Sequence, residues 1–275
     1  MEEIVIREAV IHDMPGICHI HRNDDDPWSR PAECAAWVTK RKARGFYIQV
    51  ALINDMVVGH GEWVVSDEAS GKHYYLGLLQ IDDDFQKRGI GRQMLADGAR
   101  VAKTQGIKKI VTIPEIETGS HLFYAKCGFE TGRNIMGVTL PVRDHGYSQK
   151  YTAYDGAPYK VVAKEAFVFG AFQASARHMW EVYNQKPVAD DRNVATLLSD
   201  SGECIQLGWY AKNHTAHVLF WSNRPTHEKV LDILTFANGL SFRYVNFMFF
   251  EEYAKLLRAF DGDVNVRDRE IYLMV

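Results

Sequence analysis

Paired cysteines are missing from this sequence. Its four cysteines, Cys18, Cys34, Cys127 and Cys204, are spread over 275 residues, and no two of them form a C-x-x-C pair. Zinc sites and disulfide frameworks usually show such pairs or a dense, regular spacing. The sequence therefore predicts free thiols in a reducing compartment and no bound metal.

Long apolar runs and an excess of basic charge are missing as well. No apolar stretch approaches the roughly 20 residues of a membrane-spanning helix, and the acidic start Met1-Glu2-Glu3 lacks the apolar segment of a signal peptide. The net charge is −3, whereas nucleic-acid-binding domains are usually basic. With 47% hydrophobic and 24% charged residues, we expect a soluble cytoplasmic protein of one or two domains, without a membrane or nucleic-acid partner.

Two common nucleotide-binding motifs are also absent. No Gly-Lys-Ser/Thr ending marks a P-loop, and Met94 stands where a dinucleotide-binding fingerprint needs its third glycine. The sequence contains instead a segment from Tyr74 to Thr104 that reads as strand, loop and helix.

The first part of this segment, 74–81, has one polar side chain in eight residues, Gln80, and predicts a strand buried on both faces. Three aspartates end the run. From Ile90 the period becomes helical, and Gly106 supplies a stop signal.

The loop between strand and helix is basic and contains glycine. Gly89 and Gly91 allow the backbone to come close to a ligand, and the first N–H groups of the helix have no internal partner. Lys87, Arg88 and Arg92 add positive charge at the same place. The pattern predicts binding of a polyanion at the end of a sheet; the alternative is a solvated charged turn that caps the helix.

Gln86, Gly89 and Gly91 form the pattern Q-x-x-G-x-G, and the whole segment resembles the central motif of the GNAT superfamily of N-acetyltransferases. The resemblance implies acetyl-CoA as co-substrate, with its pantetheine arm beside the strand backbone and its pyrophosphate within the loop. The implied cofactor-binding residues are Leu79, Gln80, Ile81, Gln86, Lys87, Arg88, Gly89, Ile90, Gly91 and Arg92.

A second signature follows at the spacing seen in that family. Residues 118–129 have a helical period, end at Gly128 and contain Phe-Tyr-x-x-x-Gly-Phe from Phe123 to Phe129. The resemblance implies that Tyr124 protonates the departing thiolate as general acid, a task suited to a phenol; the alternative is a packing role. Glu117 is a departure, since family members often carry Asn seven residues before this tyrosine.

An acceptor amine must be neutral before it attacks, so the reaction requires a general base. In a predicted strand, 57–65, His60 and Glu62 point to the same face by alternation. We take Glu62 as the candidate general base, acting directly or through water. The alternative is that both residues face solvent.

The N-terminal region predicts a strand at 4–7, a helix capped by Asp13, an acidic loop at 21–28 and a second helix at 31–44. The resemblance implies that these helices and their loop form a wall of the acceptor site. Three carboxylates in the loop, with Trp28 and Trp63, favour a cationic amine, which could be a small molecule or a peptide amine.

The second half repeats the order of elements of the first. Strands at 194–198, 204–210 and 217–221, helix 226–238, strand 242–250, helix 251–260 and strand 268–274 follow a helix at 174–184, in the order seen from 46 to 142. We therefore expect a mixed α/β fold, the GNAT fold with a central mixed sheet flanked by helices, in two copies. The predicted domains are 1–145, which binds the cofactor, and 146–275, a degenerate copy, with a linker at 143–159.

The second copy has Trp221 to Thr226 where the glycine loop would stand, and this segment has no glycine. We expect it to be inactive and to support the first copy, as a partner subunit does; the alternative is an unrelated α/β domain. The whole chain reads as an N-acetyltransferase, monomer or homodimer, in which an amine attacks the thioester directly. The alternatives are a non-catalytic acyl-CoA sensor and an interaction scaffold.

Overall fold

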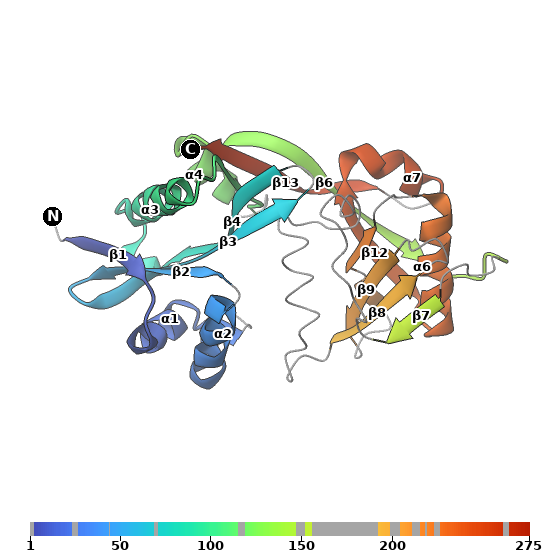
Figure 1. The fold of residues 1–275 in the computed structure, drawn as a ribbon, viewed down its shortest axis with the longest axis horizontal. Coiled ribbons are helices and arrows are strands. Elements are labelled where there is room, and N and C mark those ends of the chain that lie inside the picture. Colours follow the sequence, from blue (N-terminus) through green and yellow to red (C-terminus); the bar gives the residue numbers. More distant parts are fainter. Residues whose placement is uncertain are drawn as a thin grey trace.

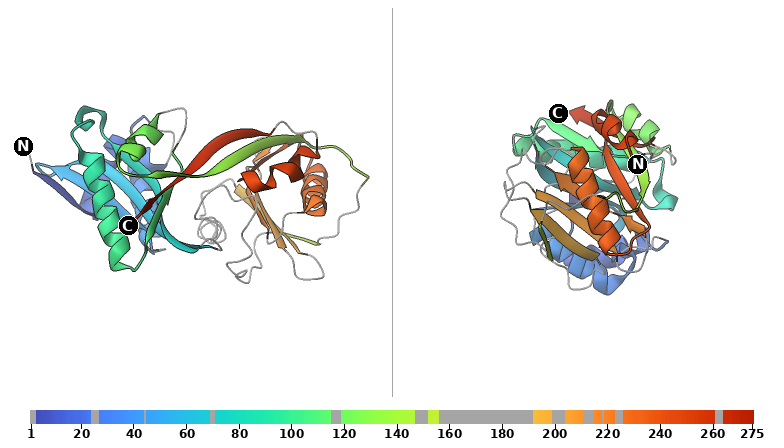
Figure 2. Two further views of the ribbon diagram at one scale, coloured as in Figure 1. Left: turned by 90° about the horizontal axis from the view of Figure 1, so that it is seen from above. Right: turned by 90° about the vertical axis from the view of Figure 1, so that its right-hand side faces the viewer.

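The computed structural model describes most of the chain. The described residues are 3–23, 27–43, 45–68, 71–114, 119–146, 152–155, 192–198, 204–210, 215–217, 219–222, 226–260 and 264–275. They form two lobes that are joined by two long strands lying side by side, β6 and β13 (Figures 1 and 2).

The first lobe is built on five strands in the order β1-β2-β3-β4-β5. Their bounds are β1 Ile4–Glu8, β2 Tyr47–Ile53, β3 Met56–Glu68, β4 Gly71–Ile81 and β5 Lys109–Thr112. Neighbouring strands are antiparallel except β4 and β5, which are parallel, with Tyr74 opposite Ile110. The helix Ile90–Thr104 connects the two strands of this parallel pair.

Helices cover both faces of this sheet (Figure 1). Helices α1 (Met14–Ile20) and α2 (Pro31–Ala43) pack on one face, over a core that includes Ile48, Val50 and Tyr75. Helices α3 (Ile90–Thr104) and α4 (Ser120–Lys126) lie on the other, over Trp63, Tyr74 and Leu76. None of the described helices is long and apolar enough to cross a lipid bilayer.

Asp13 stands at the N-cap of α1, as predicted, but it acts differently from an ordinary capping residue. Its carboxylate accepts hydrogen bonds from the backbone N–H of Val10 (2.7 Å) and from the guanidinium of Arg7 (2.6 and 2.8 Å). It therefore ties the start of the helix to strand β1.

The central strand β4 differs from the prediction that it is buried on both faces. Tyr74, Tyr75 and Leu76 are buried, whereas Gly77 is exposed and residues 78–81 are half-buried. Two causes are visible. The pairing with β5 covers only Tyr74 and Tyr75, and a β-bulge places Gly77 as an extra residue opposite the Glu62–Trp63 step of β3. Beyond Tyr75, none of the described strands pairs with this edge of β4.

The second lobe contains a four-stranded sheet of the described strands in the order β11-β9-β8-β7, together with helices α6 and α7 and strands β10 and β12. Their bounds are β7 Thr152–Asp155, β8 Arg192–Leu198, β9 Cys204–Tyr210, β10 Thr215–His217, β11 Leu219–Ser222, α6 His227–Gly239, β12 Tyr244–Phe250 and α7 Ala254–Arg258. The predicted strands 194–198, 204–210 and 242–250 and the predicted helix at 226–238 are present.

Three elements of this half differ from the prediction or fall outside the described residues. The strand expected at 217–221 is two strands, β10 and β11, in different sheets. Strand β7 lies inside the stretch expected to be a linker, 143–159. The helix expected at 174–184 falls outside the described residues.

The last strand, β13 (Asn265–Met274), crosses to the first lobe. It lies between β5 and β6 (Glu130–Pro141) and is antiparallel to both, while β6 runs on to pair with β12. The result is a nine-stranded sheet of the described strands, in the order β1-β2-β3-β4-β5-β13-β6-β12-β10. The strand after α4 thus joins the second lobe, and the strand after α7 joins the first, so the sheet is continuous across the predicted domain boundary at 145/146.

A close helix–sheet contact gives a test of the packing. An ideal Cβ on Gly98 of α3 would lie 2.4 Å from the indole of Trp63, which is fully buried, whereas a Cβ on Gly239 of α6 would meet nothing within 4 Å. We expect Gly98→Ala to lower the free energy of unfolding by about 1–3 kcal/mol, because overpacking outweighs the helix propensity gained. Gly239→Ala, the matched control, should leave stability unchanged or raise it by less than about 1 kcal/mol. Urea unfolding followed by circular dichroism measures both, and a Gly98→Ala protein as stable as wild type would contradict the packing.

Candidate functional site

A cavity of about 650 Å³ opens where β4 and β5 diverge. Four elements line it: the end of β4, the loop after it, the first turn of α3 and one side of α4. The lining residues are Leu79, Ile81, Phe85, Gln86, Lys87, Gly89, Ile90, Gly91, Arg92, Ser120, Phe123, Tyr124 and Lys126.

The loop from β4 to α3 is held by its own side chains. The Asp82 carboxylate accepts from the backbone N–H of Asp84 (3.1 Å), and Gln86 Nε2 donates to the carbonyl of Ile81 (3.3 Å) and to Asp83 (2.8 Å). The backbone turns through the left-handed region twice, at Lys87 (φ 62°) and Gly89 (φ 81°). These contacts aim the loop at the cavity and show that Gln86 shapes the loop through its side chain.

The two glycines serve different purposes. Gly89 is the N-cap of α3 and has a positive φ that favours glycine, with open space where a Cβ would be. At Gly91 a Cβ would lie 3.1 Å from the Phe123 ring of α4, so a side chain here would narrow the cavity. The N-cap has no side chain to satisfy the first N–H groups of the helix, which are therefore free to meet an anion.

Basic side chains surround this helix end. Lys87 and Arg92 come from the loop and the first turn, and Lys126 comes from α4. The positive end of the helix and three cations therefore share one cavity, which suits a ligand with phosphate groups.

Tyr124 places a phenol at the inner side of the cavity. It is 7% exposed and lies between Phe123 and Phe129, with ring centroids 5.1 and 5.2 Å away. Burial raises the pKa of Tyr124 to about 12, and a hydrogen bond with the Thr112 side chain offsets part of this rise. The phenol therefore keeps its proton throughout the neutral pH range.

Nine of the twelve candidate residues named from the sequence line this cavity. Gln80, Arg88 and Glu62 do not. Gln80 directs Nε2 toward the carbonyl of Ile20 (3.5 Å), and Arg88 donates to the carbonyl of Asp84 (2.9 Å) while its guanidinium lies over Phe85.

Four lining residues, Phe85, Ser120, Phe123 and Lys126, were not among the candidates. Ser120 and Phe123 share the face of α4 that carries Tyr124, so the helical period contained the signal. Lys126 had no distinguishing pattern, because its position depends on how α4 packs against α3.

A buried polar cluster occupies the opposite face of the sheet. His60 and Glu62 do share a face, as alternation predicted, but both are buried (0% and 4% exposed) rather than facing solvent. His60 Nδ1 is 2.9 Å from Nε2 of His21, the residue that caps the C-terminal end of α1, and Glu62 pairs with Arg41 of α2 at 3.4 Å.

Trp28 also belongs to this buried cluster. Its ring centroid is 4.5 Å from that of His60, while Trp63 is buried on the other face against Tyr74. Neither tryptophan is exposed in an open acceptor site, and the acidic residues 24–26 lie outside the described residues.

The end of α1 is fixed to the end of β4. Asp82 is buried and pairs with Arg22 at 3.1 Å and with His19 at 3.5 Å. The end of helix α1 is therefore attached at Asp82, the residue that follows the cavity-lining Ile81. Among the described residues, no group of three His, Cys, Asp or Glu side chains could hold a metal ion.

The arrangement of the mixed sheet and its flanking helices is that of the GNAT fold. Residues 9–129 match the profile of the acetyltransferase (GNAT) family, so the resemblance drawn from the sequence is confirmed and this part of the chain is a GNAT domain. None of the curated proteins compared with the chain matches it.

Solved structures share the fold over nearly the whole chain. A GCN5-related N-acetyltransferase from Anabaena variabilis has a TM-score of 0.70 at 11% identity, covering 99% of this chain and 73% of its own. A GCN5-related N-acetyltransferase from Kribbella flavida has 0.65 at 10%, with 99% and 71% covered. A tandem GNAT protein from the clavulanic acid biosynthesis pathway has 0.60 at 14%, with 98% and 97% covered. The mixed α/β GNAT fold expected from the sequence is therefore confirmed.

The burial of His60 leads to a prediction about how the free energy of unfolding depends on pH. Burial, His21 and the Arg41 guanidinium hold the pKa of His60 well below its ordinary value. As pH falls below about 6.5, the unfolded chain takes up this proton before the folded protein does, so the free energy of unfolding should fall, by up to about 1.4 kcal/mol per pH unit.

Urea unfolding between pH 7.5 and 5 measures this slope. His60→Phe should flatten it, and His12→Gln, which changes an exposed histidine, should not. Equal slopes in His60→Phe and wild type would contradict the assignment.

Proposed function

We propose that this protein is an acetyl-CoA-dependent N-acetyltransferase that acetylates a primary amine. The observation that carries the proposal is one cavity that combines the glycine loop at the start of α3 with the buried phenol of Tyr124. The first suits the phosphates of acetyl-CoA, and the second suits its thioester. The acceptor is proposed to be a cationic small molecule or a peptide amine.

The residues fit acetyl-CoA as co-substrate. The N–H groups of Ile90, Gly91 and Arg92, with Lys87 and Lys126, would hold the pyrophosphate. The open edge of β4 at Leu79 to Ile81 would hydrogen-bond the pantetheine arm, because β5 ends its pairing at Tyr75. The absence of a Cβ at Gly91 keeps the space between Phe123 and the loop open.

The proposed chemistry is direct attack. A carbon–nitrogen bond forms at the thioester carbonyl while the carbon–sulfur bond breaks, and a backbone N–H on the open edge of β4 stabilises the charge that develops on the carbonyl oxygen. Tyr124 gives its proton to the departing thiolate. The raised pKa supports this role because the phenol is in its protonated form at any neutral pH.

Glu62 is the proposed general base. It lies on β3 opposite Leu78, the residue before the cavity-lining Leu79, and Arg41 holds its carboxylate. Since it does not line the cavity, we propose that it takes the proton from the amine through water.

We further propose that 1–145 is the catalytic domain and that 146–275 is a degenerate copy without a cofactor site. The reciprocal exchange of β6 and β13 supports a duplication. The role of the second copy would be structural, since it completes the sheet of the first.

Calorimetric titration with acetyl-CoA tests the binding site. We expect micromolar affinity and one molecule bound per chain. Gly91→Glu should weaken binding at least tenfold, because it adds bulk and negative charge beside the phosphates; tenfold is about 1.4 kcal/mol. Ala96→Glu is the control, since it adds the same charge to an exposed position of α3 outside the cavity. Absence of binding would refute the proposal, and a stoichiometry of two would refute the degenerate second copy.

Removal of the Tyr124 hydroxyl tests the proposed role of this residue as general acid. With any amine that the wild type acetylates, Tyr124→Phe should lower kcat by roughly 10²–10⁴-fold and leave acetyl-CoA affinity within about threefold. Tyr74→Phe is the matched control, because this tyrosine is also buried, its hydroxyl has no hydrogen-bond partner among the described residues, and it does not line the cavity. Unchanged kcat in Tyr124→Phe would rule out the acid role.

A further inference from the structure

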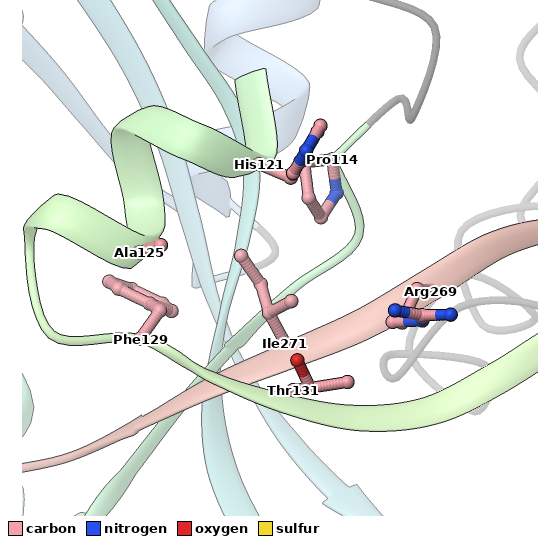
Figure 3. A pocket seen from close by; sticks show the side chains of 7 residues that line it. All are labelled: Pro114, His121, Ala125, Phe129, Thr131, Arg269 and Ile271. Carbon is pink, nitrogen blue, oxygen red and sulfur yellow. The ribbon is translucent and has the colours of Figure 1, made fainter. Parts of the chain in front are cut away.

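A second cavity lies on the far side of α4 and shares no residue with the first. Its volume is about 190 Å³, the space of about six water molecules at roughly 30 Å³ each. The lining residues are Pro114, His121, Ala125, Phe129, Thr131, Arg269 and Ile271 (Figure 3). Nothing in the acetyl transfer described above uses it.

The lining is divided into an apolar part and a polar part. Phe129 and Ile271, both 7% exposed, contribute apolar surface, with Pro114 and Ala125 beside them. Arg269, Thr131 and His121 contribute a guanidinium, a hydroxyl and an imidazole. In Figure 3, Arg269 and Thr131 lie on the two exchanged strands, and His121 lies on α4. A ligand that satisfies both parts has an apolar body and an acidic head.

The guanidinium of Arg269 is held in place from one side. Its Nε donates to Asn134 Oδ1 (2.9 Å), and Asn134 Nδ2 donates to Glu251 of the second lobe (2.7 Å). Among the described residues, Asn134 is the hydrogen-bond partner of the Arg269 side chain. The two terminal nitrogens of the guanidinium are therefore left for a ligand, and this fork matches the geometry of a carboxylate.

The strands are irregular at this place. From Ile271 to Arg269 the chain of β13 advances by two residues while β6 advances by three, from Thr131 to Asn134, so β6 carries one extra residue. A second shift of register follows between Asp268 and Val266. Such bulges re-aim side chains and are common beside binding sites. Here the irregularity brings Thr131, Arg269 and Ile271 to the same cavity.

We propose that this cavity binds a small organic carboxylate. The carboxylate would accept hydrogen bonds from Arg269 and Thr131, and its apolar body would lie against Phe129 and Ile271. The proposal is independent of acetyl transfer, because the two cavities have separate linings.

Benzoate is a suitable probe, since it combines a carboxylate with a compact apolar ring. Calorimetric titration of the full chain should show saturable binding of one benzoate per chain, with Kd below about 5 mM. Benzyl alcohol, which lacks the charge, and inorganic phosphate, which lacks the apolar body, should each bind at least tenfold more weakly. No saturable benzoate binding, or phosphate binding as tight as benzoate, would overturn the proposal.

Substitutions in the lining of the cavity test whether benzoate binds there. Arg269→Met should weaken benzoate binding at least tenfold, whereas Arg243→Met, which removes the same charge from an exposed position outside the cavity, should have no effect. Ala125→Phe should weaken binding by filling the cavity while all charges remain. Thermal unfolding within a few degrees of wild type shows that each variant is folded, and unchanged benzoate affinity in both Arg269→Met and Ala125→Phe would place the ligand elsewhere.

Discussion

The early end of the pairing between β4 and β5 is the constraint on which the site depends. Two parallel strands pair at Tyr74 and Tyr75 and then diverge. Just beyond, the Leu76 carbonyl accepts a hydrogen bond from the Thr112 hydroxyl (2.9 Å). Further along this edge of β4 no strand of the described residues pairs with it, and unpaired backbone groups are costly unless a ligand or water satisfies them. The loop that follows β4 turns the chain into α3, so the positive end of that helix comes to the open edge. The cavity is a consequence of this divergence, and α4 with its tyrosine closes its remaining side.

The exchange of β6 and β13 makes the two lobes dependent on each other. Without β13, β5 would be an edge strand and β6 would have no partner in the first lobe; without β6, β12 would lose its antiparallel neighbour. Exposed edges of this kind invite aggregation. The second lobe can therefore be required by the first, because the chain that follows it supplies the strand that completes the first sheet. This gives a physical reason for the chain to keep both halves.

Local patterns allowed much of the site to be predicted. Gln86, Gly89 and Gly91 are close in sequence, and the helical period around Tyr124 is a short-range signal, so nine of the twelve candidates meet in one cavity. Features set by distant contacts were missed. Alternation placed His60 and Glu62 on one face, but only the packing of α1 and α2 decides that this face is buried. The position of β13 between β5 and β6 depends on pairing across more than 120 residues, and the short strand β7 appeared to be a linker.

Helix α4 separates the two cavities, and this explains why a seven-residue helix carries so many different side chains. Ser120, Phe123, Tyr124 and Lys126 face the larger cavity, while His121 and Ala125 face the smaller one. Phe129 connects the two sides of the helix. Its ring lines the smaller cavity and lies edge-on to the ring of Tyr124, with the two ring centroids 5.2 Å apart. Packed interiors leave little room for one ring to move without the next. Ile271 of β13, the last strand of the chain, belongs to the same buried cluster as Phe129 and Tyr124, so this strand contributes to the packing around the phenol.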